Sequence, residues 1–318
     1  MQILSVTNVQ VAKGPKGVHH AVFAIILLLS LGLFWRTFSN LVVYTWGHES
    51  YSHILLIPIL SLYLIYLEKR KIFAEIQYSL GLGIGAMVCG ICLYIISVLK
   101  SFPPGGSGDL SLSVFSLVLV WIGAFVCCYG IWAARIALFP LLFLFLMIPI
   151  PDKLLDPTIH LLQLGSTEIA FLIFKAVGVP VLRQGFILSL PGVTIEVAKE
   201  CSGIRSSVAL FITCLLAGHL YLRTGWKVFL FALISVPMAI IKNGIRIATL
   251  TLLSIKVDPS FLTGDLHRDG GFVFFLLALL LLLPVLILLR KSEHSVSSPN
   301  RWSNTPLPNA PEKLGGST

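Results

Sequence analysis

The sequence predicts an all-α, multi-pass membrane protein of about eight transmembrane helices, with a short β-hairpin outside the membrane just before Cys201. Three observations predict this fold. Hydrophobic residues make up 56% of the 318 positions and charged residues only 12%, a composition typical of membrane proteins. Apolar runs of bilayer-spanning length recur along the chain. Short groups of lysine and arginine separate them, so the net charge of +9 marks a cytoplasmic face rather than a nucleic-acid partner.

Three regions follow from this pattern. Residues 1–18 are polar and contain Lys13 and Lys16, which predicts a cytoplasmic N-terminal segment. Residues 19–290 form the predicted membrane domain. The apolar run that opens it has no small-residue cleavage site, so we expect a retained signal anchor. Residues 291–318 are rich in Ser, Pro and Asn, which predicts a disordered cytoplasmic tail.

The eight predicted spans follow from the apolar runs. They cover residues 20–38, 53–67, 80–99, 110–130, 131–150, 204–222, 228–255 and 272–289. Residues 157–177 are apolar but carry charged side chains, and they could span the bilayer, lie in its interface or re-enter it. The polar segment 242–246 predicts an interruption of the long run that contains it.

The positive-inside rule orients these spans. If residues 157–177 do not cross, both termini share one side, and so do the basic groups. These groups are Lys13/Lys16, Lys69–Lys71, Arg135, Arg223/Lys227 and Arg290/Lys291. That side is therefore predicted to be cytoplasmic. The loops around residues 48–52, 100–109, 152–201 and 256–271 then face outward.

Cys201 has the most distinctive local context of the six cysteines. Residues 186–190 and 193–197 alternate apolar and polar side chains around Pro191-Gly192, which predicts a β-hairpin with a type II turn. A long helix follows, so Cys201 lies at a strand-to-helix junction, just ahead of Ser202 as a plausible N-cap. Free N–H groups at a helix start favour a thiolate and could form an oxyanion hole. The alternative is an inert, buried cysteine that opens a membrane helix.

Two further residues are predicted to reach the same membrane depth as Cys201. Arg246 comes about nineteen residues after Lys227, which places it at the outer boundary of its helix. His267 precedes the last helix on the same side. A Cys, a His and an Arg are the parts needed for thiol-based acyl transfer. Each could instead be structural, as a snorkelling arginine or a solvated histidine.

Several neighbours could support this constellation. Arg205, at i+4 from Cys201, would share its helical face. Asp269 flanks His267 and could orient its ring. His48, Glu49 and His53 raise a metal possibility, but two His and a Glu without a matching ligand at regular spacing are a weak signal. We therefore predict no metal site and no cofactor.

At these positions the chain resembles the exosortase/archaeosortase family of multi-pass membrane cysteine transpeptidases. The resemblance rests on five motifs in order: Tyr51-Ser-His53, Ile148-Pro-Ile-Pro151, Glu200-Cys-Ser-Gly-Ile204, Asn243-Gly-Ile-Arg-Ile247 and Leu266-His-Arg-Asp-Gly-Gly-Phe272. Spacing and order match from about residue 44 to residue 289. Two positions depart from the usual pattern: Glu200 stands where a small residue is more usual, and Ile54 where glycine is common.

The resemblance implies roles for individual residues. Cys201 would be the nucleophile, Arg246 its charge partner or oxyanion stabiliser, and His267 the acid/base. Asn243, Arg205, Asp269, Tyr51 and His53 would be substrate-binding or supporting residues. Members of the family process exported proteins whose C-terminal signal combines a Pro-containing motif, a membrane helix and a basic cluster. By this resemblance the chain lies in a bacterial inner membrane, in contact with lipid, with its site facing outward.

One rival function comes from a different class. A transporter for a cell-envelope or exopolysaccharide component could use Lys242 and Arg246 to line a substrate path, with Cys201 incidental. Transporters commonly contain internal repeats, and the sequence shows none. A transporter also gives no reason for a hairpin that delivers a thiol to a helix start.

Overall fold

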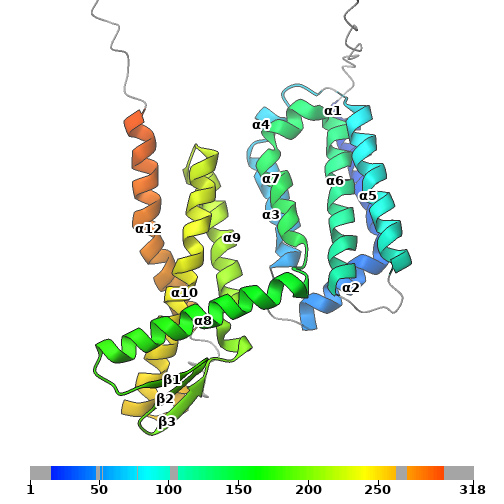
Figure 1. The fold of residues 1–318 in the computed structure, drawn as a ribbon. Helices are drawn as coiled ribbons and strands as arrows, with labels where there is room; N and C mark the ends of the chain where they lie inside the picture. The colour runs from blue at the N-terminus through cyan, green and yellow to red at the C-terminus, as the bar shows by residue number, and fades with distance from the viewer. Residues whose placement is uncertain are drawn as a thin grey trace, which may run out of the picture.

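The computed structural model describes residues 16–47, 51, 53–76, 78–100, 107–262 and 271–296. Helices dominate these residues, and one three-stranded sheet accompanies them. Figure 1 shows most helices running side by side, with the sheet at one end of the bundle. The predicted all-α membrane class with a small β element is confirmed.

The first predicted span is not a single straight helix. Instead of one helix over residues 20–38, the chain forms α1 (Lys16–Leu33) and α2 (Trp35–Gly47). The two are bent by 74° at the break between them. Phe34 occupies the break, is fully buried, and packs its ring 4.1 Å from that of Tyr94. This contact holds the bend, and α2 runs across the end of the bundle (Figure 1).

The N-terminal half of the bundle contains two long helices and several short ones. They are η2 (Ile54–Leu56), α3 (Ile57–Leu67), α4 (Lys69–Ile72), α5 (Leu80–Lys100), α6 (Ser107–Ile136), α7 (Leu138–Phe143) and η3 (Leu144–Met147). Glycines let α5 and α6 approach closely, since a Cβ at Gly123 would lie 2.8 Å from the carbonyl oxygen of Gly83. Gly130 has a φ of 85° and turns α6 at the predicted boundary between two spans.

Eight full-length spans are not found. Among the described residues, six helices are long and apolar enough to cross a membrane, or seven if the bent α1/α2 pair is one span. The predicted spans at 53–67 and 131–150 are lost, whereas α8 (Asp152–Ala176), which is not among the eight predicted spans, is counted. The helical segments at the two lost spans, Ile54–Leu67 and Leu138–Met147, are short, below the roughly 17 residues that a span needs.

Helix α8 (Asp152–Ala176) resolves the ambiguous segment of the sequence. It is long enough to span, but its mean hydropathy of 1.2 is the lowest of the six candidate spans. Figure 1 shows α8 lying crosswise to α6, α9, α10 and α12, at the end of the bundle that carries the sheet. This orientation fits an interfacial helix, the alternative in which residues 157–177 do not cross.

The sheet is antiparallel, in the order β1 (Leu182–Gln184), β2 (Ile187–Leu190), β3 (Val193–Glu196). Strands β2 and β3 are the predicted hairpin, and Gly192 between them has a φ of 84°, as its turn requires. Strand β1 was not predicted. Its three residues are too few to show a periodicity.

The C-terminal half carries the site. After η4 (Lys199–Ser202) come α9 (Ile204–Tyr221), α10 (Gly225–Lys256), η5 (Pro259–Leu262) and α12 (Gly271–Val296). The predicted interruption at residues 242–246 is wrong, because α10 is one continuous helix there. Lys242, Asn243 and Gly244 are buried rather than looped out. A Cβ at Gly244 would lie 2.5 Å from the side chain of Ile169, so α8 packs directly on the helix at this point.

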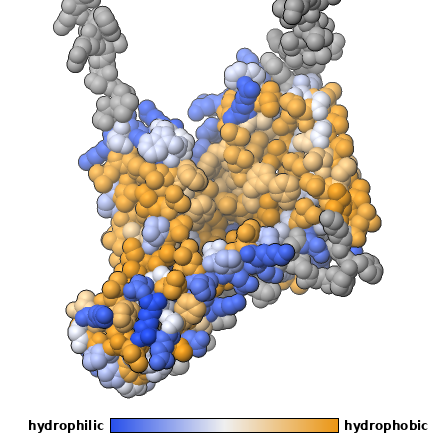
Figure 2. All heavy atoms as spheres, in the orientation of Figure 1, coloured by the Kyte–Doolittle hydropathy of each residue, from blue (hydrophilic) through white to orange (hydrophobic). Residues whose placement is uncertain are grey.

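The two ends of the bundle differ from its middle. Figure 2 shows a hydrophobic surface over the upright helices and hydrophilic residues towards both ends, as a protein in a bilayer requires. The start of α1, the turn between α9 and α10, and the end of α12 lie at the end opposite the sheet (Figure 1). Helix α12 also extends through residue 296, six residues into the predicted tail.

Candidate active site

Cys201 lies in the 3-10 turn η4, between β3 and α9. Its backbone N–H donates to the carbonyl oxygen of Ala198 at 3.0 Å, so this N–H is not free to bind an oxyanion. The predicted N-cap, Ser202, is wrong. Gly203 caps α9 instead, with a φ of 74°. The Ser202 hydroxyl is fully buried and makes no hydrogen bond within the described part of the chain.

Asn243 connects α10 to the turn that carries Cys201. Its Nδ2 donates to the carbonyl oxygen of Cys201 at 2.9 Å and to the hydroxyl of Ser166 at 3.0 Å. Reversing the amide would set its oxygen against the Cys201 carbonyl, so the contact fixes the orientation. Its Oδ1 is then a buried acceptor without a hydrogen bond to any described residue. Asn243, predicted as a supporting residue, thus links α10 and α8 to the turn that carries Cys201.

Gly203 is required at this contact for two reasons. Its φ of 74° lies in the left-handed region, which strains any residue with a Cβ. A Cβ there would also lie 2.9 Å from the side-chain carbon and oxygen of Asn243. The close approach of η4 to α10 therefore depends on a residue without a side chain.

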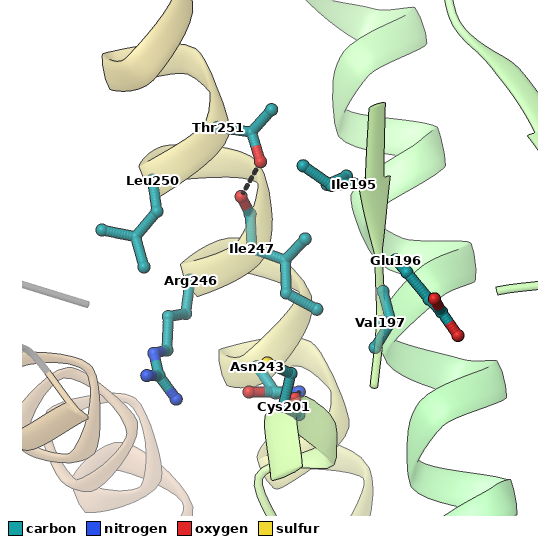
Figure 3. A pocket seen from close by; sticks show the side chains of 9 residues that line it. All are labelled: Ile195, Glu196, Val197, Cys201, Asn243, Arg246, Ile247, Leu250 and Thr251. Atoms are coloured by element: carbon teal, nitrogen blue, oxygen red, sulfur yellow. Dashed lines mark hydrogen bonds between the residues drawn. The ribbon is translucent and has the colours of Figure 1, made fainter. Parts of the chain in front are cut away.

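A cavity of about 220 Å³ opens beside Cys201. Its lining residues are Ile195, Glu196, Val197, Cys201, Asn243, Arg246, Ile247, Leu250 and Thr251. Figure 3 shows it between β3 and α10, with Cys201, Asn243 and the guanidinium of Arg246 towards one end. Arg246 interacts electrostatically with Cys201 in this cavity. The cavity thus joins an apolar wall to a positively charged end that holds a thiol.

The structure separates the two candidate arginines. Arg246 lines the cavity with Cys201. Arg205, one turn along from Cys201 in sequence, has an exposed side chain and does not line it. A buried cation lies one turn before Arg246: Lys242 is 3% exposed and donates to the hydroxyl of Ser206. That hydroxyl donates in turn to the carbonyl oxygen of Gly203 at 3.0 Å.

Tyr51 and His53 do not line this cavity. Tyr51 is 4% exposed, and its hydroxyl donates to the carbonyl oxygen of Ile150 at 3.4 Å. Burial raises the pKa of Tyr51, which keeps the hydroxyl protonated as a donor. Ser111 donates to the carbonyl oxygen of Pro149 at 2.7 Å. The motif 148–151 is therefore held from two sides where the chain enters α8.

Two predicted site residues, His267 and Asp269, lie outside the described residues, as do His48 and Glu49 of the weak metal hypothesis. Within the described ranges, no group of three His, Cys, Asp or Glu side chains could hold a metal ion. Of the predicted constellation, the described residues therefore bring together Cys201 and Arg246, with Asn243 beside them.

Sequence reasoning missed several residues around the site. Ile247, Leu250 and Thr251 share one face of α10 with the predicted Asn243 and Arg246, at three- and four-residue spacing. An uninterrupted helix would have revealed this signal. Nothing in the sequence marks Ser166 as a neighbour of the site. A second, larger hollow shares Glu196 with the first and is lined by α8 and η4 residues, including His160 and Lys199. In it, Lys199 pairs with Asp156 at 3.2 Å.

Comparison with known proteins places this geometry in a family. The family model described as transmembrane exosortase matches residues 45–284, about three quarters of the chain. The match includes Tyr51, Cys201, Arg246 and His267. No curated protein and no solved structure matches the chain.

Proposed function

The chain belongs to the transmembrane exosortase family, and on this premise we propose that it is a membrane-embedded cysteine protease and transpeptidase. Its substrates would be exported proteins that end in a sorting signal with a Pro-containing motif, a membrane helix and a basic cluster. One observation carries the proposal: Cys201 and Arg246 share a cavity beside a β-strand, and Asn243 fixes the turn that bears the thiol.

The reaction follows from these groups. The Cys201 thiolate attacks the carbonyl carbon of the scissile peptide bond, and negative charge develops on the carbonyl oxygen. Arg246 supplies positive charge to the thiolate and then to that oxygen. The C–N bond breaks, and the leaving amine takes a proton, for which we propose His267 as the donor. The acyl group remains as a thioester on Cys201.

A second nucleophile resolves the thioester. Water, or a hydroxyl or amine of a surface molecule, attacks the same carbonyl carbon and loses its proton to His267. The C–S bond breaks and returns the thiolate. With water the outcome is proteolysis, and with a surface acceptor it is transfer of the exported protein.

The proposed location is a bacterial inner membrane, with Cys201 on the outer side. The support is the distribution of charge: the turn with Arg223 and the end of α12 with Arg290 and Lys291 lie opposite the sheet. The positive-inside rule assigns such an end to the cytoplasm. A transporter is less well supported, because α10 continues unbroken through Lys242 and Arg246, whereas transporters commonly place polar backbone in broken helices.

The test is to trap the acyl-enzyme. In the native host, Cys201→Ala should reach normal membrane levels while exported proteins with C-terminal sorting signals accumulate uncleaved. Mass spectrometry of the wild-type chain should find a hydroxylamine-sensitive adduct on Cys201 that the variant lacks. Cys201→Ser should fail too, because a serine alkoxide is far harder to form than a thiolate. Normal processing by Cys201→Ala would refute the proposal.

A further inference from the structure

The third strand, β3, is an open edge of the sheet. The strand order is β1-β2-β3, and β3 pairs in the sheet with β2 alone. The hydrogen bond from the N–H of Val197 to the carbonyl oxygen of Phe186, at 3.0 Å, continues this pairing by one residue. Hydrogen-bonded pairs alternate along an antiparallel ladder. Thr194 and Glu196 therefore belong to non-bonded pairs, and their peptide groups point away from β2.

These outward peptide groups form a short template for another strand. The carbonyl oxygen of Glu196 already accepts from the N–H of Ala198 at 3.0 Å. The N–H of Glu196 and both peptide groups of Thr194 make no hydrogen bond to another described residue. Both residues are exposed. Such an edge is ready to pair with an extended chain.

The edge leads directly to the thiol. Ile195 points from β3 towards α10 and into the cavity, while Glu196 points to the other face of the strand (Figure 3). Cys201 lies five residues after Glu196 and lines the same cavity. Side chains alternate between the two faces of a strand. A strand added beside β3 would therefore direct every second side chain over the apolar wall formed by Ile195, Ile247 and Leu250.

We propose that β3 is the docking edge for the polypeptide substrate, which binds as a fourth strand and presents its scissile bond to Cys201. The main chain pairs with Thr194 and Glu196, and one or two apolar side chains enter the cavity. A cavity of about 220 Å³ is smaller than the ~300 Å³ lower bound for whole-ligand pockets, which suits single side chains. This inference rests on the proposed function for the nature of the substrate.

The outward peptide groups of β3 determine which kind of molecule can bind at this edge. A lipid tail offers no partner for the N–H groups of Thr194 and Glu196, and a helical segment has already used its own. An extended chain has both donors and acceptors free. A second copy of this protein, paired through its own β3, is the other extended occupant, and the experiment distinguishes it.

The experiment places the photo-cross-linker benzoylphenylalanine at Thr194 in the native host, in a Cys201→Ala background. The matched control carries it at Gln184, an exposed position on the opposite outer strand, β1. We expect cross-links from position 194 to an extended segment just before the C-terminal membrane helix of an exported protein, at least tenfold above those from position 184. Equal yields, no cross-link, or a cross-link to a second copy of the chain would overturn the proposal.

A proline substitution tests the hydrogen bond itself. Thr194→Pro removes the outward N–H without breaking the ladder to β2, whereas Thr194→Val keeps it. With the cross-linker moved to Glu196, Thr194→Pro should lower the yield about tenfold and Thr194→Val by less than twofold. Unchanged iodoacetamide labelling of Cys201, measured with that residue restored, shows that the proline variant is folded. Equal yields from the two variants would contradict the pairing.

The two proposals fail separately. Cross-linking in the Cys201→Ala background needs no chemistry at residue 201. If position 194 captures the expected segment while wild-type Cys201 never carries an acyl group, the docking edge stands and the proposed reaction falls. If the acyl-enzyme forms but position 194 captures no such segment, the reaction stands and the docking edge falls.

Discussion

The side-chain amide of Asn243 donates a hydrogen bond of 2.9 Å to the backbone carbonyl of Cys201, 42 residues away in the chain. Helix α10, which carries Asn243, also carries Arg246 one turn later. The thiol and the guanidinium are therefore positioned by one rigid element, although they come from different parts of the sequence. Such preorganisation is what a reaction with developing charge needs.

Asn243→Ala should lower substrate processing by 10- to 100-fold, because it frees the Cys201 turn and leaves the buried Ser166 hydroxyl without this donor. Losing such buried bonds costs about 1–3 kcal/mol. Thr213→Val is the control, since Thr213 does not line the cavity and its hydroxyl bonds within α9, to the carbonyl oxygen of Ala209. Processing at matched membrane levels is the measurement. Equal activity of the two variants would show that Asn243 does not position Cys201.

Gly203→Ala should abolish most processing, because it adds backbone strain and a Cβ 2.9 Å from Asn243. Gly192→Ala is the control for backbone strain alone. Gly192 has a φ of 84°, similar to that of Gly203, but no neighbouring atom lies within 4 Å of an added Cβ. Each variant should lose about 1–2 kcal/mol of stability, measured by thermal unfolding in detergent. Only Gly203→Ala should also slow the alkylation of Cys201. A similar slowing in Gly192→Ala would point to general destabilisation.

Arg246→Lys should lose most processing, on the order of 10²-fold if the guanidinium binds the oxyanion. Lysine keeps the charge but offers no planar pair of donors. Arg205→Lys is the matched variant and should retain a substantial share of activity, since Arg205 is exposed and outside the cavity. Substrate turnover decides between them. If Arg205→Lys were inactive while Arg246→Lys processed substrate normally, Arg205 rather than Arg246 would be the catalytic arginine.

Lys242→Met should leave thermal stability unchanged or higher, because a buried cation that bonds a neutral hydroxyl is replaced by an apolar chain of similar length. It should also slow iodoacetamide labelling of Cys201 severalfold at pH 7, since a nearby positive charge favours the thiolate. Lys227→Met is the control. That lysine, also buried in α10, bonds Ser292 at the far end of the helix. Identical labelling rates in both variants would exclude an electrostatic role for Lys242.

A membrane-impermeant thiol reagent applied to intact spheroplasts should label Cys201, and Cys201→Ala should lose that label. Cys89 and Cys92 are exposed on α5, but within its apolar span, so lipid should shield them from the reagent. Labelling that requires permeabilised membranes would reverse the orientation and place the site in the cytoplasm.

The elements that sequence predicted well are those with a local physical cause. Pro191-Gly192 favours a turn, Gly130 with its positive φ changes the direction of α6, and the run after Gly203 is mostly apolar. The failures have tertiary causes. The bend at Phe34 depends on a contact with Tyr94. In sequence, Lys242-Asn-Gly244 resembles a helix break. The helix continues because Lys242 and Asn243 donate hydrogen bonds to serines of α9 and α8, and α8 packs on Gly244.

Sequence predicted that Cys201 and Arg246 lie close together, but not how the fold builds the cavity that they line. Cys201 and Arg246 were chosen by residue type and membrane depth, and both line one cavity. Ser202 was the predicted cap because serine is common at that position. The left-handed φ of Gly203 and the approach of Asn243 explain why the chain uses glycine there. Ser166 could not have been found, since nothing local separates it from other helical serines.

Helix α10 is 32 residues long, about 48 Å at ~1.5 Å per residue, against a hydrocarbon layer of about 30 Å. Counted from Gly225 at the basic end, the layer is crossed after about 20 residues. Arg246 then stands at the water boundary, and Leu250 and Thr251 stand above it. If the proposed function holds, cleavage would occur at a fixed height over the lipid. For a substrate held by its own membrane helix, the number of residues between that helix and the cleaved bond becomes a recognition element in itself.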